Sequence, residues 1–388
     1  MTNETKNVPE LRFPEFEGEW EEKKLGEVSN VTMGQSPKSS NYTDNPRDMI
    51  LVQGSADIDK GKIRPRIYTK EITKKVEIND ILLSVRAPVG EIAIAQFEAC
   101  IGRGMCAITG NLFLYYFLDF FKIRKKWNYF SQGSTFESVS GKEINKLKLS
   151  ITNKEEQQKI GDFFSKLDRQ IELEEQKLAL LEEQKKGYIQ KIFSQELRFK
   201  DENNNSYPEW KIKKLEEISE FQNGKAHENF VSDTGKFILV NSKFISTESK
   251  VKKYVDKQLT PLGINDIAIV MSDVPNGKAL AKCYLIENDN TFTLNQRIGR
   301  IFNIEGNSRF LFTQINRNKQ LLKYDSGVGQ TNLKKSEIIG IKIYCPNKRE
   351  QDKIGDFFIN LDSIIEKQST KVELLKQRKK GLLQKMFI

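Results

Sequence analysis

Two long segments of the chain carry apolar residues at alternating spacings of three and four positions, the pattern of a heptad repeat. Neither segment contains proline, and each runs for about 38 residues, or roughly 57 Å of α-helix at 1.5 Å per residue. The pattern therefore predicts two long helices, each with one continuous apolar seam. The seam positions are Ile160, Phe164, Leu167, Ile171, Leu178, Leu181, Tyr188 and Ile192 in the first segment, and Ile354, Phe358, Leu361, Ile365, Val372, Leu375, Leu382 and Met386 in the second.

Polar residues interrupt both seams at equivalent places, first at Glu174 and Gln368 and then at Lys185 and Lys379. Polar residues within a seam usually fix the register of paired helices at some cost in stability. Two matched helices in one chain pair most simply in the antiparallel direction, as a coiled-coil spacer. The alternative is that each helix packs on its own domain and the two helices never meet.

The two helical segments are copies of each other. Glu156–Ser194 aligns without gaps on Glu350–Ile388 at an offset of 194 residues, and 21 of the 39 aligned positions are identical. A repeat period of half the chain is too long for a solenoid. The chain was therefore built twice, with a globular half followed by a helix in each copy. Two similar but unequal halves suit a target that has two different parts.

The globular halves correspond more weakly than the helices. Leu11–Phe13 recurs as Leu197–Phe199, and Asn79–Ile81 recurs as Asn265–Ile267, whereas the stretches between such matches differ. Halves that keep a common frame and diverge in their loops are expected when each half recognises something different.

Inside each half, short β-prone runs alternate with turn signals. The clearest runs are Ile81–Val85 and Ile267–Met271, and one amphipathic helix is predicted in each half, at Leu112–Tyr129 and Phe310–Tyr324. The fold class predicted is α+β, with two similar globular domains separated by two long helices that pair as an antiparallel coiled coil. The predicted domains are 1–152 (first globular domain), 153–195 (first helix), 196–346 (second globular domain) and 347–388 (second helix).

The chain is basic, with a formal net charge of +10. The two repeated segments contribute almost none of this charge, so the basic excess lies on the globular halves. Such an excess favours a polyanionic partner, because phosphate contacts dominate affinity for nucleic acids. On charge alone, an excess that serves only solubility is about as good an interpretation.

Four cysteines occur without a CxxC pair, which favours a thiol-reducing compartment. The first residues lack an apolar signal core, and the chain has no apolar run of 18 residues. We expect a soluble, cytoplasmic protein.

Several kinds of catalytic motif are missing from the sequence. The chain has one histidine, His227, which argues against histidine-based triads and multi-histidine metal sites, and a lone histidine in a loop is usually solvated. There is no GxxxxGK[ST] phosphate loop and no GxGxxG motif. An Asn-Pro-Pro-aromatic motif of the kind that amino-methyltransferases use is also absent. We therefore expect no active site, no metal site and no bound cofactor on this chain.

Polar residues next to glycines recur at equivalent places in the two halves. Arginine can donate two hydrogen bonds to guanine, glutamine and asparagine pair with adenine, and serine or threonine can contact a base or a phosphate. Glycine lets the backbone approach a duplex closely, although all these residues are also common in loops. The candidate DNA-binding residues are Gln35, Ser36, Lys38, Ser84, Arg86, Arg103, Gln132 and Ser134 in the first half, and Asn223, Lys225, Asn276, Lys278, Gln296, Arg297, Gln330 and Thr331 in the second.

The repeated motifs carry a family resemblance over essentially the whole chain. Gln-x-Lys-Ile-Gly-Asp-Phe-Phe occurs at 157–164 and 351–358, and Lys-Lys-Gly-x-x-Gln-Lys occurs at 185–191 and 379–385. Two such helices, each after a divergent domain, resemble the specificity subunit of type I restriction-modification systems. The resemblance departs at one boundary, because Pro346 precedes the second helix whereas Thr152-Asn153 precedes the first.

The resemblance implies a function and a set of partners. It implies two target-recognition domains, each of which reads one half of a split double-stranded DNA target through the major groove, with the helices as the spacer. It also implies two modification (methyltransferase) subunits and the translocating restriction subunits as partners. S-adenosylmethionine, ATP and Mg are then expected on those partners, and this chain is then a non-catalytic subunit for host defence.

Two other functions remain open from the residues. The chain could be a structural or adaptor protein whose coiled coil binds another protein without DNA; a salt-sensitive affinity for duplex DNA would argue against that reading. It could also be a self-contained modification and restriction enzyme, which the missing methyltransferase and nuclease motifs disfavour.

Overall fold

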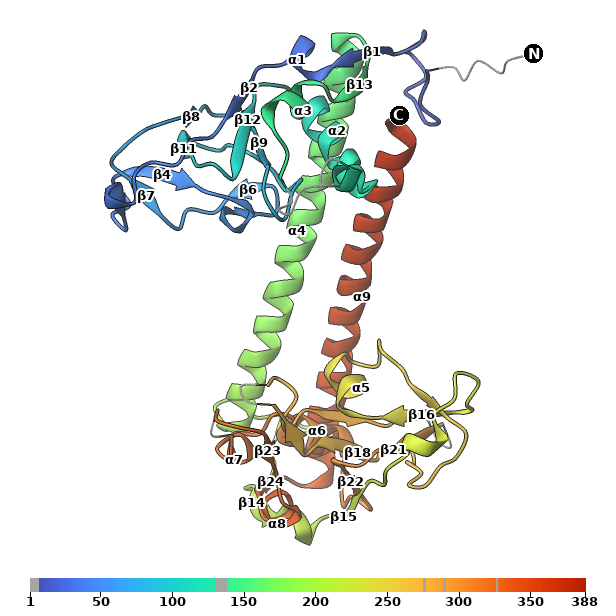
Figure 1. Cartoon of the computed structure of the whole chain (residues 1–388). Coiled ribbons are helices and arrows are strands. Elements are labelled where there is room, and N and C mark those ends of the chain that lie inside the picture. Colours follow the sequence, from blue (N-terminus) through green and yellow to red (C-terminus); the bar gives the residue numbers. More distant parts are fainter. Residues whose placement is uncertain (1–6, 130–137, 275–276, 289–290, 326) are drawn as a thin grey trace, which may run out of the picture. The chain divides into compact units, whose positions relative to one another are not determined.

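The computed structural model describes residues 7–129, 138–274, 277–288, 291–325 and 327–388 (Figure 1). The chain forms two compact units, Met1–Gln176 with Ser369–Ile388 and Lys177–Gln368. Each unit contains one globular half together with stretches of both long helices, α4 (Lys154–Phe193) and α9 (Lys348–Met386). The fold is α+β, as the sequence predicts, and the two long helices begin within two residues of the predicted boundaries.

The first unit contains two larger sheets and a small one. Their strand orders are β2-β12-β9-β10-β6-β5, β3-β7-β4-β11-β8 and β1-β13. The strands are β1 (Glu21–Lys24), β2 (Val31–Met33), β3 (Tyr42–Thr43), β4 (Met49–Val52), β5 (Ile58–Asp59), β6 (Lys62–Ile63), β7 (Tyr68–Thr69), β8 (Lys75–Val76), β9 (Ile81–Ser84), β10 (Ile92–Ile94), β11 (Ala99–Ile101), β12 (Met105–Ile108) and β13 (Lys148–Ile151). The short helices are α1 (Leu25–Val28), α2 (Leu112–Ile123), α3 (Gly141–Asn145) and the 3-10 helices η1 (Ser39–Asn41), η2 (Ser55–Asp57) and η3 (Lys126–Tyr129).

The second unit repeats this plan. Its sheets have the orders β15-β22-β18-β20, β17-β16-β21, β14-β24 and β19-β23. The strands are β14 (Lys211–Lys214), β15 (Glu220–Asn223), β16 (Phe237–Val240), β17 (Tyr254–Val255), β18 (Ile267–Val270), β19 (Ser272–Asp273), β20 (Cys283–Leu285), β21 (Phe292–Leu294), β22 (Ile298–Phe302), β23 (Thr331–Asn332) and β24 (Lys342–Cys345). The helices are α5 (Ser242–Ser246), α6 (Ser308–Ile315), α7 (Lys319–Leu322), α8 (Lys335–Ile339), η4 (Leu215–Glu217) and η5 (Glu228–Phe230).

The strongest predicted strands are the central ones, and both are buried on two faces. In β9, Ile81 and Leu83 pack in one apolar cluster, while Leu82 packs in another. In β18, Ile267 and Ile269 likewise face a different cluster from Ala268 and Val270. Because side chains alternate along a strand, a run that is apolar at every position marks a strand buried on both faces.

The predicted amphipathic helices exist but are shorter than their apolar patterns. α2 begins after the cap residue Asn111 and ends at Ile123, and the chain then turns through Lys125, whose φ is +55°. The second predicted helix is broken into α6 and α7, with Arg317 at φ +56° between them. A left-handed residue cannot continue a right-handed helix, so the predicted single helices Leu112–Tyr129 and Phe310–Tyr324 were too long.

The two long helices pair in the antiparallel direction within each unit. In the first unit, Lys379 of α9 pairs with Asp168 of α4 at 2.7 Å, and Lys371 pairs with Glu174. The pair with the higher residue number in α9 has the lower residue number in α4, so the two helices run in opposite directions. The alternative in which the helices never meet is wrong.

The same pairing occurs in the second unit. There, Lys185 pairs with Asp362, and the rings of Tyr188 and Phe357 lie 5.1 Å apart. The polar seam residues Lys185 and Lys379 thus both bind an aspartate of the opposite helix, which is consistent with a role in register.

The C-terminal end of each long helix completes the aromatic core of a globular half. The ring of Phe387, the residue after the end of α9, lies 5.2 to 6.3 Å from the rings of Phe113, Phe120 and Trp20 in the first unit. The corresponding Phe193 of α4 contacts Trp210 at 6.2 Å and Phe310 at 5.7 Å in the second unit. Each globular half therefore uses one helix that follows it directly and one that comes from the other copy of the repeat.

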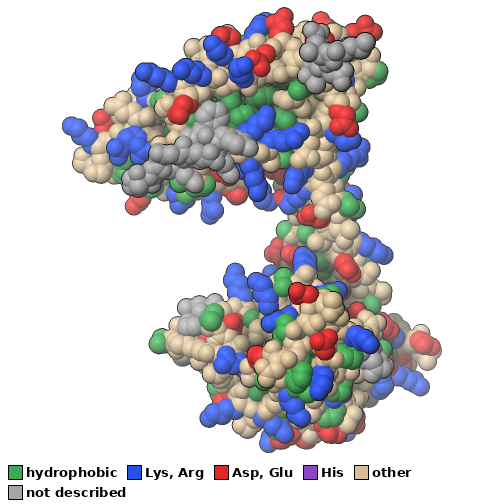
Figure 2. Space-filling model, turned by 45° about the vertical axis from the view of Figure 1, so that its right-hand side comes forward, with side chains coloured by type: hydrophobic (Ala, Val, Ile, Leu, Met, Phe, Trp, Pro, Cys, Tyr) green, Lys and Arg blue, Asp and Glu red, His purple; other side chains and the backbone are tan. Residues whose placement is uncertain are grey.

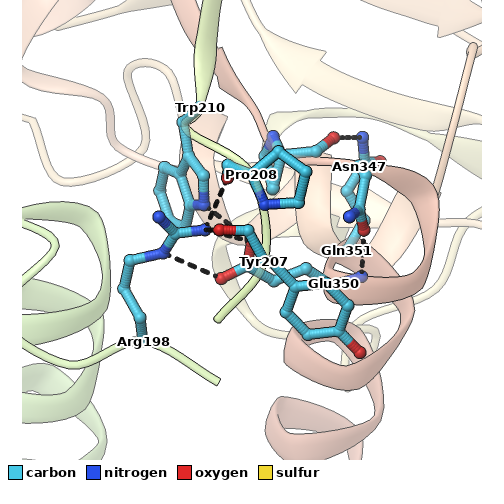
Figure 3. A network of polar contacts seen from close by, with 8 residues as sticks. Arg198, Tyr207, Pro208, Trp210, Asn347, Glu350 and Gln351 are labelled. Carbon is cyan, nitrogen blue, oxygen red and sulfur yellow. Dashed lines mark hydrogen bonds and ion pairs between the residues drawn. The ribbon is translucent and has the colours of Figure 1, made fainter. Parts of the chain in front are cut away.

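A buried carboxylate at the start of each long helix fixes the segment that enters the globular half. Glu350 accepts hydrogen bonds from Arg198 Nε at 3.1 Å, Arg198 Nη2 at 2.7 Å and Trp210 Nε1 at 2.9 Å (Figure 3). Glu156 accepts two hydrogen bonds from Arg12, both at 2.7 Å, in the same way. Both carboxylates are fully buried, so charge-assisted bonds offset the loss of hydration.

Candidate nucleic-acid interface

Three loops of the first unit meet where the parallel strands β4 and β11 end. We call this surface the first reading edge: residues 34–36, 53–54 and 102–104. The Gln35 N–H donates to Ile101 O at 2.9 Å, the Gly102 N–H donates to Val52 O at 2.8 Å, and the Arg103 N–H donates to Ser36 Oγ at 3.1 Å. Three of the predicted contact residues, Gln35, Ser36 and Arg103, are therefore brought together by hydrogen bonds to the backbone.

Glycine is required at this edge because the loops touch through their backbones. A Cβ atom on Gly34 would lie 2.1 Å from Gly102 O, and one on Gly104 would lie 2.2 Å from Gln53 O. Gln35 and Arg103 project as exposed side chains beside this tight backbone. Sequence reasoning missed Gln53, which follows β4; its only sequence signal was the Gln-Gly pair at 53–54.

The second unit builds the same backbone frame, which we call the second reading edge: residues 223–225, 241 and 295–297. The Gly224 N–H donates to Ile298 O at 2.9 Å, and the Asn295 N–H donates to Val240 O at 3.1 Å. A Cβ atom on Gly224 would lie 2.0 Å from Asn295 O. These contacts correspond to those of Gly34 and Gly102 in the first edge.

The two edges carry different side chains on this common frame. Lys225 occupies the position of Gln35, because the N–H of each donates to the last residue of the neighbouring strand, Leu294 or Ile101. Gln296 likewise occupies the position of Arg103. The frame thus presents an amide and a guanidinium in one unit, and an ammonium and an amide in the other.

The second edge also contains local constraints of its own. Arg297 is exposed and adopts φ +66°, at the position that Gly104 fills in the first edge. Gln296 Nε2 donates to Glu228 at 2.8 Å. Asn223 is exposed at the end of β15, one residue before Gly224.

Two further candidates of the first half lie on exposed loops near the first edge. Arg86 is exposed and forms a β-bridge with Ser138. The loop of Lys38 is held by Glu71, whose carboxylate accepts the Lys38 N–H at 3.0 Å and the Asn41 side-chain amide at 2.6 Å. The pKa of Glu71 is held below its usual range by these hydrogen bonds, chiefly by the one from the Lys38 N–H and then by the one from Asn41.

Other candidates are engaged within the protein. Ser84 is fully buried, where its hydroxyl donates to Pro88 O and accepts the Glu91 N–H. Thr331 is buried and donates to Asp325 at 3.2 Å, and Gln330 donates to the Ser272 hydroxyl at 2.6 Å. Lys278 is exposed but lies outside both edges. Gln132, Ser134 and Asn276 lie outside the described residues.

The predicted solvent exposure of His227 was wrong. The residue is fully buried beside the second edge, with both ring nitrogens in contact with polar partners. The sequence held no signal for this, because two of the ring's polar partners, Leu259 and Thr293, come from distant segments. The expectation that a loop histidine is solvated rests on average behaviour.

The chemistry of both edges is that of binding. Amide, guanidinium and ammonium groups donate to base edges and phosphates, and lysine and arginine side chains are spread over the surface in Figure 2. Among the described residues, no group of three or more His, Cys, Asp or Glu could hold a metal ion. A search of the same residues finds no helix with the length and apolar character of a membrane span.

The relationship to known proteins is decided by two matches to one family model. The model described as the type I restriction modification DNA specificity domain matches residues 17–183 and again residues 207–376. This chain belongs to the type I restriction-modification DNA specificity family. The two matches coincide with the two copies of the repeat, so the specificity domain occurs twice in the chain.

Curated members of the family are similar in sequence. A putative type I restriction enzyme MjaX specificity subunit of Methanocaldococcus jannaschii is 32% identical over 205 residues, and the match covers 51% of this chain and 48% of that relative. The chain thus spans about half the length of that relative. The type I restriction enzyme MjaVIII specificity subunit of the same organism is 25% identical over 97% of this chain and 93% of its own length.

Solved structures of the specificity family share the fold. The S subunit of a type I restriction-modification system from M. genitalium superposes with a TM-score of 0.63, at 18% identity, over 98% of this chain and 99% of that one. A chain from a study of complex assembly and conformational transition of the type I R-M system gives a TM-score of 0.56 at 14% identity, over 95% and 97% of the two chains.

Proposed function

We propose that this chain is the subunit of a type I restriction-modification complex that recognises a bipartite, asymmetric DNA target, with one half-site for each globular half. The observation that carries the proposal is the pair of reading edges, which share a backbone frame and differ in their side chains. At equivalent positions the preferred base differs: Gln35 suits adenine where Lys225 suits guanine, and Arg103 suits guanine where Gln296 suits adenine. A common frame with different donors is what two readers of unlike half-sites require.

We further propose that the chain is non-catalytic and docks two identical modification subunits, which would carry S-adenosylmethionine. Restriction subunits, with ATP and Mg, would join the complex. Exposed positions that are identical in α4 and α9 support docking. Leu180 is 58% exposed, and the corresponding Leu374 is 59% exposed. The globular halves differ in sequence, but this exposed leucine occurs in both long helices. We therefore expect the same kind of partner at both leucines.

A pair of helix-internal glycines supports the same conclusion. Apart from the neighbouring residues and the backbone of the helix itself, no atom of the described residues lies within 4 Å of a Cβ built on Gly187 or Gly381. Glycine inside a helix is about 1 kcal/mol less favourable than alanine, and the fold gives no reason for it here. Each glycine lies seven residues after an exposed leucine, which is two turns along the same helix face. This face permits close approach of a partner helix.

The docking proposal predicts separate losses at the two glycines. Gly187→Tyr should lower the partner stoichiometry from two to one, because the side chain blocks close approach, and Gly187→Tyr with Gly381→Tyr should abolish binding. Native mass spectrometry of the co-expressed complex measures this. Gly187→Ala with Gly381→Ala is the matched control, which should keep two partners and stabilise the helices. Two partners bound to the double tyrosine variant would contradict the proposal.

The recognition proposal is tested by methylome sequencing of cells that express this chain with and without its modification partner. We expect a new split motif, methylated on adenine only when both proteins are present. No new motif, with the partner shown to be bound and active, would exclude the proposed recognition function. Methylation by this chain without the partner would exclude a non-catalytic role.

A further inference from the structure

Each reading edge contains a backbone carbonyl that is bound by a side chain. This side chain comes from a distant segment in the first unit and from two residues further along the chain in the second. The carbonyl belongs to Gln35 in the first unit and to Lys225 in the second, the residue that follows the close-packed glycine. In the first unit, the Thr73 hydroxyl donates to Gln35 O, and it also lies 3.4 Å from Cys100 Sγ in the middle of β11.

In the second unit, His227 performs this task. Its Nδ1 lies 2.7 Å from Lys225 O, while Nε2 lies 3.2 Å from the Leu259 N–H and 3.0 Å from Thr293 Oγ1. Because Nδ1 faces a carbonyl and Nε2 faces a backbone N–H, the ring is neutral with its proton on Nδ1. His227 and Thr293 are both fully buried.

The two arrangements are equivalent in position and different in chemistry. Cys100 pairs with Leu51 in the parallel ladder of β11 and β4, and Thr293 pairs with Leu239 in the ladder of β21 and β16. In both units, a side chain therefore connects the carbonyl of the reading loop to the middle residue of the equivalent strand, β11 or β21. Thr73 and His227 lie at unrelated positions in the chain, so the shared feature is the position of the carbonyl.

We propose that Thr73 and His227 are positioning residues for base recognition, each acting on one half-site. This inference rests on the proposed function. The held carbonyl fixes the backbone from which Gln35 or Lys225 projects, relative to Arg103 or Gln296 across the edge. Precise hydrogen-bonding recognition requires contact residues that are locked by a supporting layer of hydrogen bonds. Loss of this support loosens the side chain that would contact the base.

Two pairs of variants test the proposal in the full chain with its modification partner. Thr73→Val removes the hydroxyl and keeps the shape, and Thr73→Ser restores the hydroxyl. His227→Asn places an amide N–H at the position of Nδ1, so it keeps the bond to Lys225 O. His227→Gln reaches the position of Nε2, so it keeps the contact with the Leu259 N–H and loses the bond to the carbonyl.

The readout is the ratio of affinities for the duplex target, established by methylome sequencing, and for duplexes in which one half-site is replaced. Thr73→Val should lower discrimination at the first half-site about tenfold and leave the second within about twofold. His227→Gln should do the reverse. Thr73→Ser and His227→Asn should stay within about threefold of the natural chain. Thermal unfolding of each variant is measured in parallel.

A purely structural role predicts a different pattern. His227→Asn and His227→Gln each lose one side of the same buried network, so such a role lowers stability and discrimination equally in both. Three outcomes would overturn the positioning role and leave the proposed function intact, provided that the natural complex discriminates between targets. They are equal effects of the two His227 variants, effects on both half-sites from one variant, and no effect of any variant. A natural complex with no discrimination at either half-site would instead overturn the proposed function, and this inference with it.

Discussion

Glu350→Ala should destabilise the second unit by about 3–5 kcal/mol, the usual effect of breaking a buried ion pair by removing one partner. The carboxylate is fully buried and accepts hydrogen bonds from Arg198 and from the Trp210 indole. Its removal leaves a guanidinium without its carboxylate partner and a buried indole N–H without its acceptor. Urea unfolding followed by tryptophan fluorescence measures the change, since Trp210 reports on the site itself.

Glu156 supplies a matched comparison in the first unit. Its carboxylate also binds an arginine, Arg12, but its further partner is the Thr152 hydroxyl instead of an indole. A hydroxyl can turn to another acceptor, whereas an indole N–H cannot, so Glu156→Ala should cost less than Glu350→Ala. Equal costs for the two variants, or a loss below about 1 kcal/mol for Glu350→Ala, would contradict this account.

Replacement of the segment that contains the first reading edge should change the DNA sequence recognised at one half-site and leave the other half-site unaltered. Residues 30–109 can be replaced as a block from another member of the family, because the Thr109 N–H donates to Asn30 O at 3.0 Å and the two ends of the block therefore meet. This block contains the first reading edge and leaves Trp20, α2 and Phe387 in place. The aromatic core that receives the end of α9 is thus preserved.

The expected effect of this exchange is large. Each mismatched base pair in a site costs about 1–3 kcal/mol, so three changed base pairs should lower affinity for the original target at least about a hundredfold. Methylome sequencing of the exchanged protein with its partner gives the new motif directly. The matched exchange of residues 218–305, whose ends meet through the Glu305 N–H and Ile218 O at 2.8 Å, should change the other half-site. A change in both half-sites from either exchange would refute the model of two separate readers.

The sequence was most informative where a periodic pattern spans many residues. The long helices α4 and α9 and the central strands β9 and β18 follow from apolar spacing, and the doubling of the chain follows from the identities between its two copies. The sequence was less informative where one residue ends a helix, as at Lys125 and Arg317. Neither residue type favours a left-handed φ, so the helix ends could not be predicted from helix propensity.

The supporting contacts of the reading edges could not be predicted. Thr73 and His227 approach the edges from loops, and their importance depends on backbone carbonyls that carry no sequence signal. Ser84 had the right residue type beside a strand, but the fold turned it inward to bind Pro88 O. Residue type near a glycine thus identified loops that meet at the two edges and did not distinguish exposed side chains from buried ones.

The place of Phe387 has a consequence for how the protein is made. The rings that surround it, Trp20, Phe113 and Phe120, leave the ribosome early, whereas Phe387 is synthesised more than 250 residues later than any of them. Domains usually fold in order from the N-terminus during translation. Here the aromatic core of the first globular half stays incomplete until Phe387 has emerged. Ribosome-bound nascent chains that stop short of α9 should therefore expose this incomplete core to chaperones.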